Sequence, residues 1–339
     1  MISALLPITL AVYKRTDMTQ KIRLVLSIFF AGVLAACSVA APPFDSDGVP
    51  YLRGVVIYHR YSDYGAWDSH LYMVDLTARK MTEVGADWKS VVSPINAHFS
   101  PDGQSFTFMA SAAGLEENEW DVFVTHWDGK HWAEPINLTG PNGKRDEDPK
   151  FSPDGQTIAF KQNGALATIE MDGSNFQLLT DGAEESSMPY FTADGKGLLF
   201  ERGEKIWLLR DGVETQMATE EGFSTYYPIG VDNEKFLYTQ IQSSRHDSIY
   251  FGYYDGRPPK RLPFDDRNYE SSDSYPYEDA SQYVFYVTTK PIAPLGGYNL
   301  VFADIKNNTV FDMEQVVKGA NSDLLELGPC WSGTAPFGG

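Results

Sequence analysis

Short apolar runs that alternate with polar residues recur along the chain, and no long stretch repeats its apolar residues every 3.6 positions. One set of six runs is rich in Val, Ile, Phe and Tyr, at 55–59, 106–110, 158–162, 198–202, 236–240 and 283–287. A second set of six follows them, at 70–75, 120–125, 166–172, 206–211, 248–255 and 298–304. The pattern predicts an all-β chain built from a repeated group of strands.

A turn motif separates some of these strands and gives the repeat its length. F-S-P-D-G-Q occurs at 99–104 and again at 151–156. Pro presets φ at the first corner, Asp bonds its own backbone and Gly accepts a positive φ, so the motif favours a tight turn. We call the position two residues before the Phe the repeat position. It is Ala97, Pro149 and Pro189 in the copies that keep the Phe, and Pro228, Pro276 and Pro329 in the more degenerate copies, with spacings of 52, 40, 39, 48 and 53 residues. Four strands in 40–50 residues are typical of a β-propeller blade.

The two ends of the repeat predict how the ring closes. The first blade begins at its second strand, near Val55, and the chain ends on an inner-strand sequence, L-G-P-C-W-S. We therefore expect a six-bladed β-propeller of four-stranded antiparallel blades, closed by the C-terminal strand completing the first blade. Closure in this way leaves no open sheet edge.

One repeat resembles a known family. P-K-F-S-P-D-G-Q-T-I-A-F-K-Q, followed by M-D-G-S-N-F-Q-L-L-T-D-G, is similar to the TolB-type propeller repeat over residues 149–182. The likeness is good over 97–140, fair over 189–220 and limited to spacing elsewhere. L-G-G-Y-N-L-V-F-A-D-I also resembles repeats found beside peptidoglycan-binding envelope proteins. The resemblance implies the fold and a bacterial envelope setting. It does not imply one activity, because such propellers serve as scaffolds, sugar-binding proteins, protease domains and polysaccharide lyases.

The N-terminal residues predict a secretion signal outside the fold. A basic start at Lys21 and Arg23 precedes an apolar run from Leu24 to Ala36, which is the length of a signal-peptide core. Leu34-Ala35-Ala36-Cys37 resembles the bacterial lipobox, which implies a lipid on Cys37. Ser38 then implies sorting to the outer membrane. The expected organisation is a signal peptide over 1–36 with its true start at Met18, a polar tether over 37–50 and a single propeller over 51–339. A plain secretory signal cut near Ala36 is the alternative.

The net charge limits the kinds of partner that the chain can bind, and the cysteine content limits its possible disulfides. The whole chain carries a net charge of −19. Cleavage before Cys37 leaves 23 basic and 45 acidic residues, a net charge of −22, which disfavours nucleic acid as a partner. The second cysteine, Cys330, is expected to be a buried thiol if Cys37 carries lipid. The alternative is a disulfide between the two cysteines.

The mouth of the propeller channel is the expected ligand site, on the rim opposite the S-P-D-G turns. Loops at 60–69, 111–119 and 288–297 are long there, and loops often carry function. Aromatic faces with polar edges suit sugar rings. The residues flanking the repeat position are Asn96, His98, Asp148, Lys150, Met188, Tyr190, Tyr227 and Tyr275, and the ends of the second strands add His59, Arg60, Lys161 and Arg202. Within this set, Arg60, Asn96, Asp148, Lys150, Arg202, Tyr227 and Tyr275 are predicted to bind the ligand.

A catalytic alternative uses the same rim. β-Elimination of a uronide needs a cation at the carboxylate, from Arg60, Lys161 or Arg202, and a base for the C5 proton. His59, His98 or Tyr190 could be that base, so His59, His98, Lys161 and Tyr190 are the candidate catalytic set. Hydrolysis by paired carboxylates would use Asp148 or Glu147 with Asp68. The sequence has no G-x-S-x-G, H-E-x-x-H, P-loop or dinucleotide fingerprint.

No cofactor is expected, and no histidine spacing suggests a metal site. Acidic stretches at 144–149 and 265–274 could hold Ca²⁺ but lack an EF-hand pattern, and solvated loops explain them better. The function predicted is a lipid-anchored bacterial envelope propeller, periplasmic or surface-facing, that binds a polysaccharide or an envelope protein. A polysaccharide lyase or glycosidase acting on a uronate-containing polysaccharide is the alternative.

Overall fold

The computed structural model describes residues 44–114, 119–243, 246–264, 266, 268–290 and 297–339. The predicted signal peptide and Cys37 lie outside these residues. The described chain is nearly all β, with a short helix η1 (Tyr64–Ala66) and a second helix α2 (Met313–Val316). Within it, no helix has the length and apolar content needed to span a bilayer.

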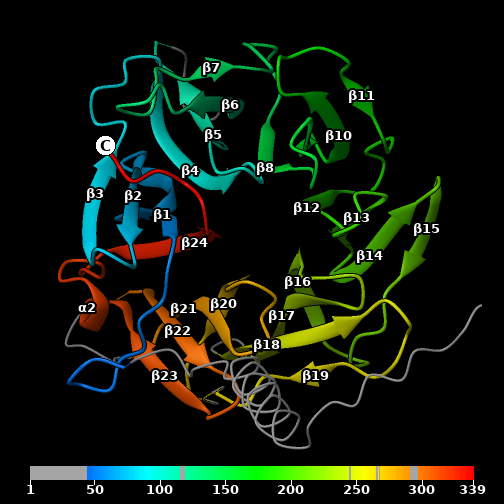
Figure 1. Cartoon of the computed structure of the whole chain (residues 1–339). Coiled ribbons are helices and arrows are strands. Elements are labelled where there is room, and N and C mark those ends of the chain that lie inside the picture. The colour runs from blue at the N-terminus through cyan, green and yellow to red at the C-terminus, as the bar shows by residue number, and fades with distance from the viewer. Residues whose placement is uncertain (1–43, 115–118, 244–245, 265, 267, 291–296) are drawn as a thin grey trace, which may run out of the picture.

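Six four-stranded antiparallel sheets form the blades of a closed ring (Figure 1). The innermost strand is named first for each blade. Blade 1 is β24 (Leu325–Ser332), β1 (Val55–Tyr61), β2 (His70–Asp75) and β3 (Lys80–Val84); blade 2 is β4 (Val91–Phe99), β5 (Ser105–Ala112), β6 (Asp121–His126) and β7 (Ile136–Asn137). Blade 3 is β8 (Asp146–Phe151), β9 (Thr157–Gln162), β10 (Ala165–Glu170) and β11 (Gln177–Leu178); blade 4 is β12 (Ser186–Phe191), β13 (Gly197–Arg202), β14 (Lys205–Arg210) and β15 (Val213–Gln216). Blade 5 is β16 (Ser224–Gly230), β17 (Lys235–Ser243), β18 (His246–Tyr253) and β19 (Lys260–Arg261); blade 6 is β20 (Ser271–Pro276), β21 (Tyr283–Thr288), β22 (Asn299–Asp304) and β23 (Thr309–Asp312).

Closure by the C-terminal strand is confirmed. β24 pairs antiparallel with β1, with Val55 opposite Ser332 and Ile57 opposite Cys330. The buried side chains of β24 join the apolar clusters on both sides of blade 1, since Cys330 packs toward blade 2 and Leu327 toward blade 6. The last strand therefore contributes to the packing between blades as well as to one sheet.

Every inner strand is interrupted at one equivalent position. The pairing register shifts there, and a residue with positive φ sits at the shift: Asn96, Asp148, Met188, Tyr227, Asp273 and Gly328. Such β-bulges bend a strand and redirect its side chains. The residue that follows the bulge is the repeat position of the sequence in five blades. In blade 6 it is Ser274, so placing the repeat at Pro276 is wrong by two residues.

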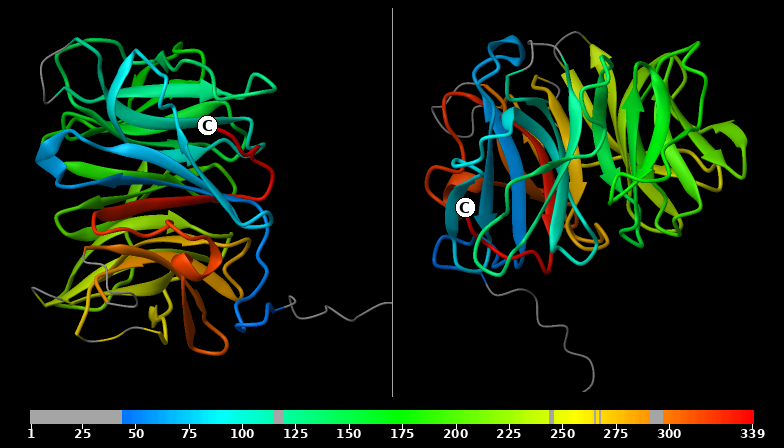
Figure 2. Two further views of the ribbon diagram at one scale, coloured as in Figure 1. Left: turned by 90° about the vertical axis from the view of Figure 1, so that its left-hand side faces the viewer. Right: turned by 90° about the horizontal axis from the view of Figure 1, so that it is seen from above.

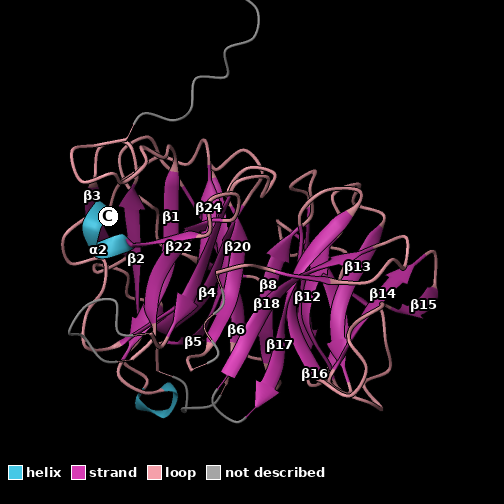
Figure 3. Cartoon of the chain, turned by 90° about the horizontal axis from the view of Figure 1, so that it is seen from below, coloured by secondary structure: helices cyan, strands magenta, loops and turns pink. Residues whose placement is uncertain are grey.

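The strands run between two rims, and loops lie at both ends of them (Figure 3). The turn rim carries the S-P-D-G turns between first and second strands. The crossover rim carries the loops between second and third strands and the entries to the inner strands. Strand β1 starts at the turn rim, because Val55 pairs with the last residue of β24.

Residues 44–50, assigned to a polar tether, contact the propeller. Val49 is buried in the cluster between blades 1 and 6, and Asp45 forms an ion pair of 2.6 Å with Arg79 in the β2–β3 turn. That turn lies at the turn rim. The N-terminal and C-terminal segments therefore lie on the same side of the propeller (Figure 2).

Candidate functional site

The inner strands bring together two rings of side chains around the channel. The bulge ring is Asn96, Asp148, Met188, Tyr227, Asp273 and Gly328. The second ring lies two residues further along each strand, toward the turn rim, and is His98, Lys150, Tyr190, Ile229, Tyr275 and Cys330. Contacts within each ring cross between blades, as in the 2.7 Å hydrogen bond from Asn96 Nδ2 to Asp148 Oδ1. A second such contact is the 3.1 Å hydrogen bond from the Gly328 N–H to Asp273 Oδ2, so bulge residues of blades 2 and 3, and of blades 1 and 6, lie side by side.

A chain of hydrogen bonds crosses the second ring. The backbone N–H of Phe151 donates to His98 Nδ1 at 3.1 Å, so the ring proton of a neutral His98 is on Nε2. This Nε2–H donates to Tyr190 Oη at 3.3 Å, and Tyr190 Oη donates to Tyr275 Oη at 3.3 Å. Tyr275 also hydrogen-bonds the buried thiol of Cys330. The chain links blades 2, 4, 6 and 1.

Both channel histidines are neutral. Burial, followed by the nearby charge of Lys150, lowers the pKa of His59 to about 3 and holds the pKa of His98 well below its ordinary value. His59 Nδ1 accepts the backbone N–H of Asn96 at 3.3 Å. In each ring the nitrogen without a proton is already occupied by a backbone donor. Neither imidazole has a free lone pair for taking a proton from a substrate.

We expect these two imidazoles to remain neutral from pH 5 to pH 8, because protonation would place an uncompensated charge in a buried site and break a backbone hydrogen bond. Two-dimensional NMR of ¹⁵N-labelled histidine side chains would follow them. His59→Gln and His98→Gln would assign the signals, and imidazole added to the sample would serve as the reference. A titration midpoint between pH 5 and 8 for either ring would contradict this assignment.

Lys150 is the unusual group of the second ring. It is 5% exposed, and the structure gives its ammonium no hydrogen bond or ion pair with any described residue. Burial lowers its pKa, while Asp148 and Asp273 act in the opposite direction. Burial raises the pKa of Asp148, and it raises the pKa of Asp273 to about 6. Lys150 is therefore buried, the two carboxylates are half-buried, and the charges of Asp148 and Asp273 both act on the pKa of Lys150.

A cavity of about 250 Å³ opens at the turn rim. All six blades contribute to its wall, which includes Phe99, Pro101, Phe191, Val231 and Trp331. His98, Tyr190 and Tyr275 of the hydrogen-bonded chain also line it. None of its described lining residues is an Asp, Glu, Lys or Arg. The sequence analysis predicts the ligand site at the opposite end of the channel, on the crossover rim.

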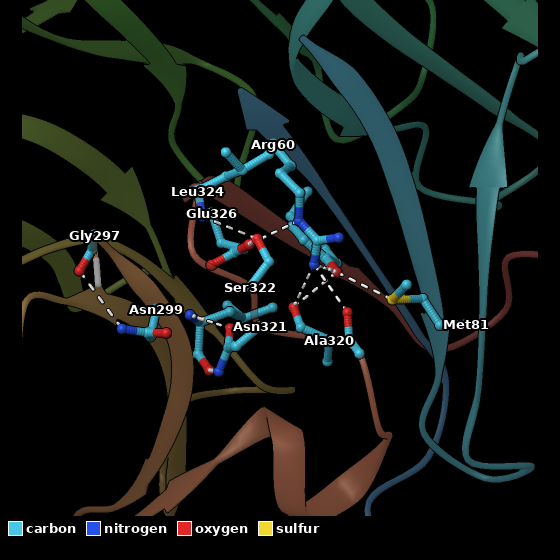
Figure 4. A network of polar contacts seen from close by, with 12 residues as sticks. Arg60, Met81, Gly297, Asn299, Ala320, Asn321, Ser322, Leu324 and Glu326 are labelled. Carbon is cyan, nitrogen blue, oxygen red and sulfur yellow. Dashed lines mark hydrogen bonds and ion pairs between the residues drawn. The ribbon is translucent and has the colours of Figure 1, made fainter. Parts of the chain in front are cut away.

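Three basic side chains that were predicted to bind a ligand at the channel mouth instead form ion pairs with acidic residues of the protein, away from the channel. Lys161 Nζ lies 2.7 Å from Glu147 and 3.0 Å from Glu185, and Arg202 forms a two-pronged ion pair with Glu214 at 2.5 and 2.9 Å. Figure 4 shows the third, Arg60, in a network at the junction of blades 1 and 6.

The guanidinium of Arg60 has protein partners on several sides. It is 2.7 Å from Glu326 Oε1, and it donates to the carbonyls of Gly319 and Ala320. Of the candidate catalytic set, His98 and Tyr190 are hydrogen-bonded to each other, whereas Lys161 is ion-paired to Glu147 and Glu185.

The predicted site residues do not include four members of the two rings, Ile229, Asp273, Gly328 and Cys330. Because the sequence analysis puts the blade 6 repeat at Pro276, Asp273 does not align with the bulge residues of the other blades. Asp273 can be recognised in the sequence as an acidic residue two positions before an aromatic residue of the inner strand, in D-S-Y. Cys330 was expected to be a buried thiol, and among the described residues it is a free, buried cysteine. No group of three His, Cys, Asp or Glu that could hold a metal ion occurs in the described part of the chain.

Comparison with known proteins places this geometry in a broad fold group. No family model matches the chain. TolB from Acinetobacter baumannii superposes with a TM-score of 0.61 at 14% identity, covering 93% of this chain and 73% of TolB. A TolB from Agrobacterium tumefaciens gives a TM-score of 0.55 at 17% identity, covering 77% of this chain and 89% of that one. The fold is that of a TolB-type six-bladed β-propeller.

Other matches to this TolB-type propeller cover parts of larger proteins. Hydrazine synthase from Kuenenia stuttgartiensis gives a TM-score of 0.63 at 11% identity, covering 84% of this chain and 48% of that one. An uncharacterized peptidase, YuxL of Bacillus subtilis, is 26% identical over 118 residues. That match spans 33% of this chain and 18% of the peptidase. At these identities the comparisons establish the fold and leave the activity open.

Proposed function

We propose that this protein is a non-catalytic binding module of the bacterial envelope, held at the outer membrane by a lipid on Cys37. Its ligand, a neutral glycan or an uncharged segment of an envelope protein, enters the cavity at the turn rim. The observation that carries the proposal is this cavity, to which all six blades contribute: its described lining is mostly aromatic, proline and serine residues, with Gly230 and Val231 from blade 5, and it includes no Asp, Glu, Lys or Arg. Aromatic planes with hydroxyl groups at their edges suit sugar rings and apolar peptide groups.

The contacts of the candidate catalytic residues argue against the lyase alternative. Elimination of a uronide requires a cation at the substrate carboxylate and a base near C5. The described wall of the cavity has no Lys or Arg, and His98 is buried, with Nδ1 accepting from Phe151 and the protonated Nε2 bonded to Tyr190. Lys161 is neutralised by Glu147 and Glu185. Burial raises the pKa of Tyr190 well above its ordinary value, which disfavours the phenolate that would act as a base.

A substitution at the cavity mouth tests the proposal. Ala193 is exposed and lines the cavity, so Ala193→Trp fills the mouth without disturbing buried packing. Ala183→Trp is the control, because Ala183 is exposed on the outer face of the ring. We expect Ala193→Trp to weaken binding to a neutral glycan array or to isolated envelope proteins at least tenfold, with Ala183→Trp unchanged.

The same preparations would be incubated with a panel of uronate polysaccharides while absorbance of the unsaturated product is followed. The proposal expects flat traces for the wild type. Product formation that His98→Ala abolishes would replace it with the lyase alternative. Equal binding by Ala193→Trp and the wild type would move the ligand away from the turn rim.

A further inference from the structure

The N-terminal segment is fastened to the propeller beside the cavity, at the turn rim. Val49 is 2% exposed in the cluster between blades 1 and 6, and Asp45 forms its ion pair with Arg79 at 2.6 Å. The carbonyl of Arg53 accepts the indole N–H of Trp331 at 2.9 Å, and Trp331 lines the cavity. The chain therefore joins the fold at the rim where the cavity opens, and Trp331 contacts both.

The link between this segment and the proposed lipid is short. Phe44 follows Cys37 by seven residues, and a fully extended link of that length spans about 25 Å at most. Strand β5, which runs from the turn rim to the crossover rim, has eight residues and is about 27 Å long. To place the crossover rim against the bilayer, the link would have to cover the height of a blade and the loops beyond it. Its length does not allow this.

Two exposed aromatic side chains lie on the same segment. Phe44 is 48% exposed and Tyr51 is 43% exposed. Tyr is enriched where proteins meet the polar surface of a bilayer, and an exposed Phe near it adds apolar surface for the same contact. This exposure does not depend on the length of the link, and it indicates the same end of the propeller.

We propose that the turn rim faces the membrane that carries the anchor, and that the cavity takes the neutral saccharide headgroup of a glycolipid in that membrane. The lipid on Cys37 and the glycan rest on the proposed function, and the inference adds the orientation and the source of the glycan. A headgroup in the same membrane stays near the cavity mouth, so its effective concentration favours binding without a further contact. The described lining has no Asp, Glu, Lys or Arg, which suits a headgroup without charge.

The two ends of β5 provide matched label positions for the orientation. Gln104 precedes the strand at the turn rim, Ala113 follows it at the crossover rim, and both are exposed. Gln104→Cys and Ala113→Cys would each carry a donor dye on the lipidated full chain in phospholipid vesicles, with an acceptor dye on the lipid headgroups. Cys330 is buried, so the wild type taken through the labelling serves as the blank.

We expect energy transfer to the membrane to be at least twofold more efficient from position 104 than from position 113. The strand between the two labels sets the difference in their distances from the bilayer. Equal transfer from both positions, or stronger transfer from position 113, would overturn the orientation.

Flotation with vesicles tests the glycolipid. The full chain carrying Cys37→Ser has no lipid, so it can be retained only by what the vesicle surface offers. We expect at least tenfold more of it on vesicles containing digalactosyl diacylglycerol, which has a neutral disaccharide headgroup, than on plain phospholipid vesicles. Ala193→Trp should abolish the difference, and Ala183→Trp on the outer face should keep it. Equal flotation with both kinds of vesicle would overturn the glycolipid as the occupant.

The outcomes separate this inference from the proposed function. Weaker binding of neutral glycans in solution by Ala193→Trp, with equal transfer from positions 104 and 113, would keep the cavity as the binding site and refute its orientation. The expected difference in transfer, with glycan and protein binding unaltered by Ala193→Trp, would keep the orientation and refute the cavity.

Discussion

Removal of residues 325–339 is expected to abolish cooperative folding of the propeller. The deletion takes away β24, the inner strand of blade 1, and exposes the full edge of β1. It also removes Cys330 and Leu327, which pack against neighbouring blades on each side. Backbone groups that lose their partners in an apolar setting are costly, and an open strand edge promotes aggregation.

Circular dichroism melting and size-exclusion chromatography would measure the loss. The truncated chain should show no cooperative thermal transition and should elute as aggregates. A chain lacking only Gly338 and Gly339 keeps β24 and should melt like the wild type. A cooperative transition of normal midpoint in the longer truncation would mean that five complete blades and an open sixth suffice for folding.

The fold was predictable because the strands and turns repeat. Each S-P-D-G turn needs Pro, Asp and Gly for separate backbone reasons, and in blades 2 and 3 the motif is complete. In blade 6 the predicted repeat position is two residues too late. Ala280 replaces the turn glycine there, and its φ is 51°. Pro276 has the residue type expected at the repeat position, but it lies two residues after it. Local sequence could not show that the bulge had moved to Asp273.

The candidate site was predictable only for residues on inner strands. A residue beside the bulge faces the ring whatever its partners are, so Lys150 and Tyr190 were predicted correctly, whereas Tyr275 entered the set only because it precedes Pro276. The cations at the ends of the second strands depend on distant partners instead. Arg60 meets Glu326, 266 positions away, and Lys161 meets Glu185, 24 positions away. Those pairings follow from the ring closure and from blade packing, which the repeat spacing does not encode.

Arg60→Met is expected to destabilise the protein by about 3–5 kcal/mol, the usual cost of leaving a buried charge without its partner. Glu326 has a fully buried side chain, and its Oε1 accepts from Arg60 Nε at 2.7 Å and from Ser322 Oγ at 2.5 Å. Arg60 also lies over the ring of Tyr72, 4.6 Å from its centroid. Urea unfolding at pH 7 would measure the change in the free energy of unfolding.

Matched variants separate charge from packing in this network. Arg60→Lys keeps the charge but loses the planar fork and much of the stacking on Tyr72, so an intermediate loss is expected. Arg60→Met combined with Glu326→Gln removes the unpaired charge and should recover part of the stability. A loss below about 1 kcal/mol in Arg60→Met would show that Glu326 is neutral or solvated without its partner.

The pH dependence of Arg60→Met carries a definite sign. Burial raises the pKa of Glu326 above its ordinary value even with Arg60 present, and removal of the guanidinium raises it further. Between the unfolded and folded pKa values the folded state holds more protons than the unfolded state, so stability falls as pH rises through that window. The deficit of Arg60→Met should therefore be larger at pH 8 than at pH 5. A deficit that is the same at pH 5 and pH 8 would mean that Arg60 stabilises the blade 1–blade 6 junction through packing alone, and a deficit that shrinks with rising pH would contradict the assigned role of the Glu326 carboxylate.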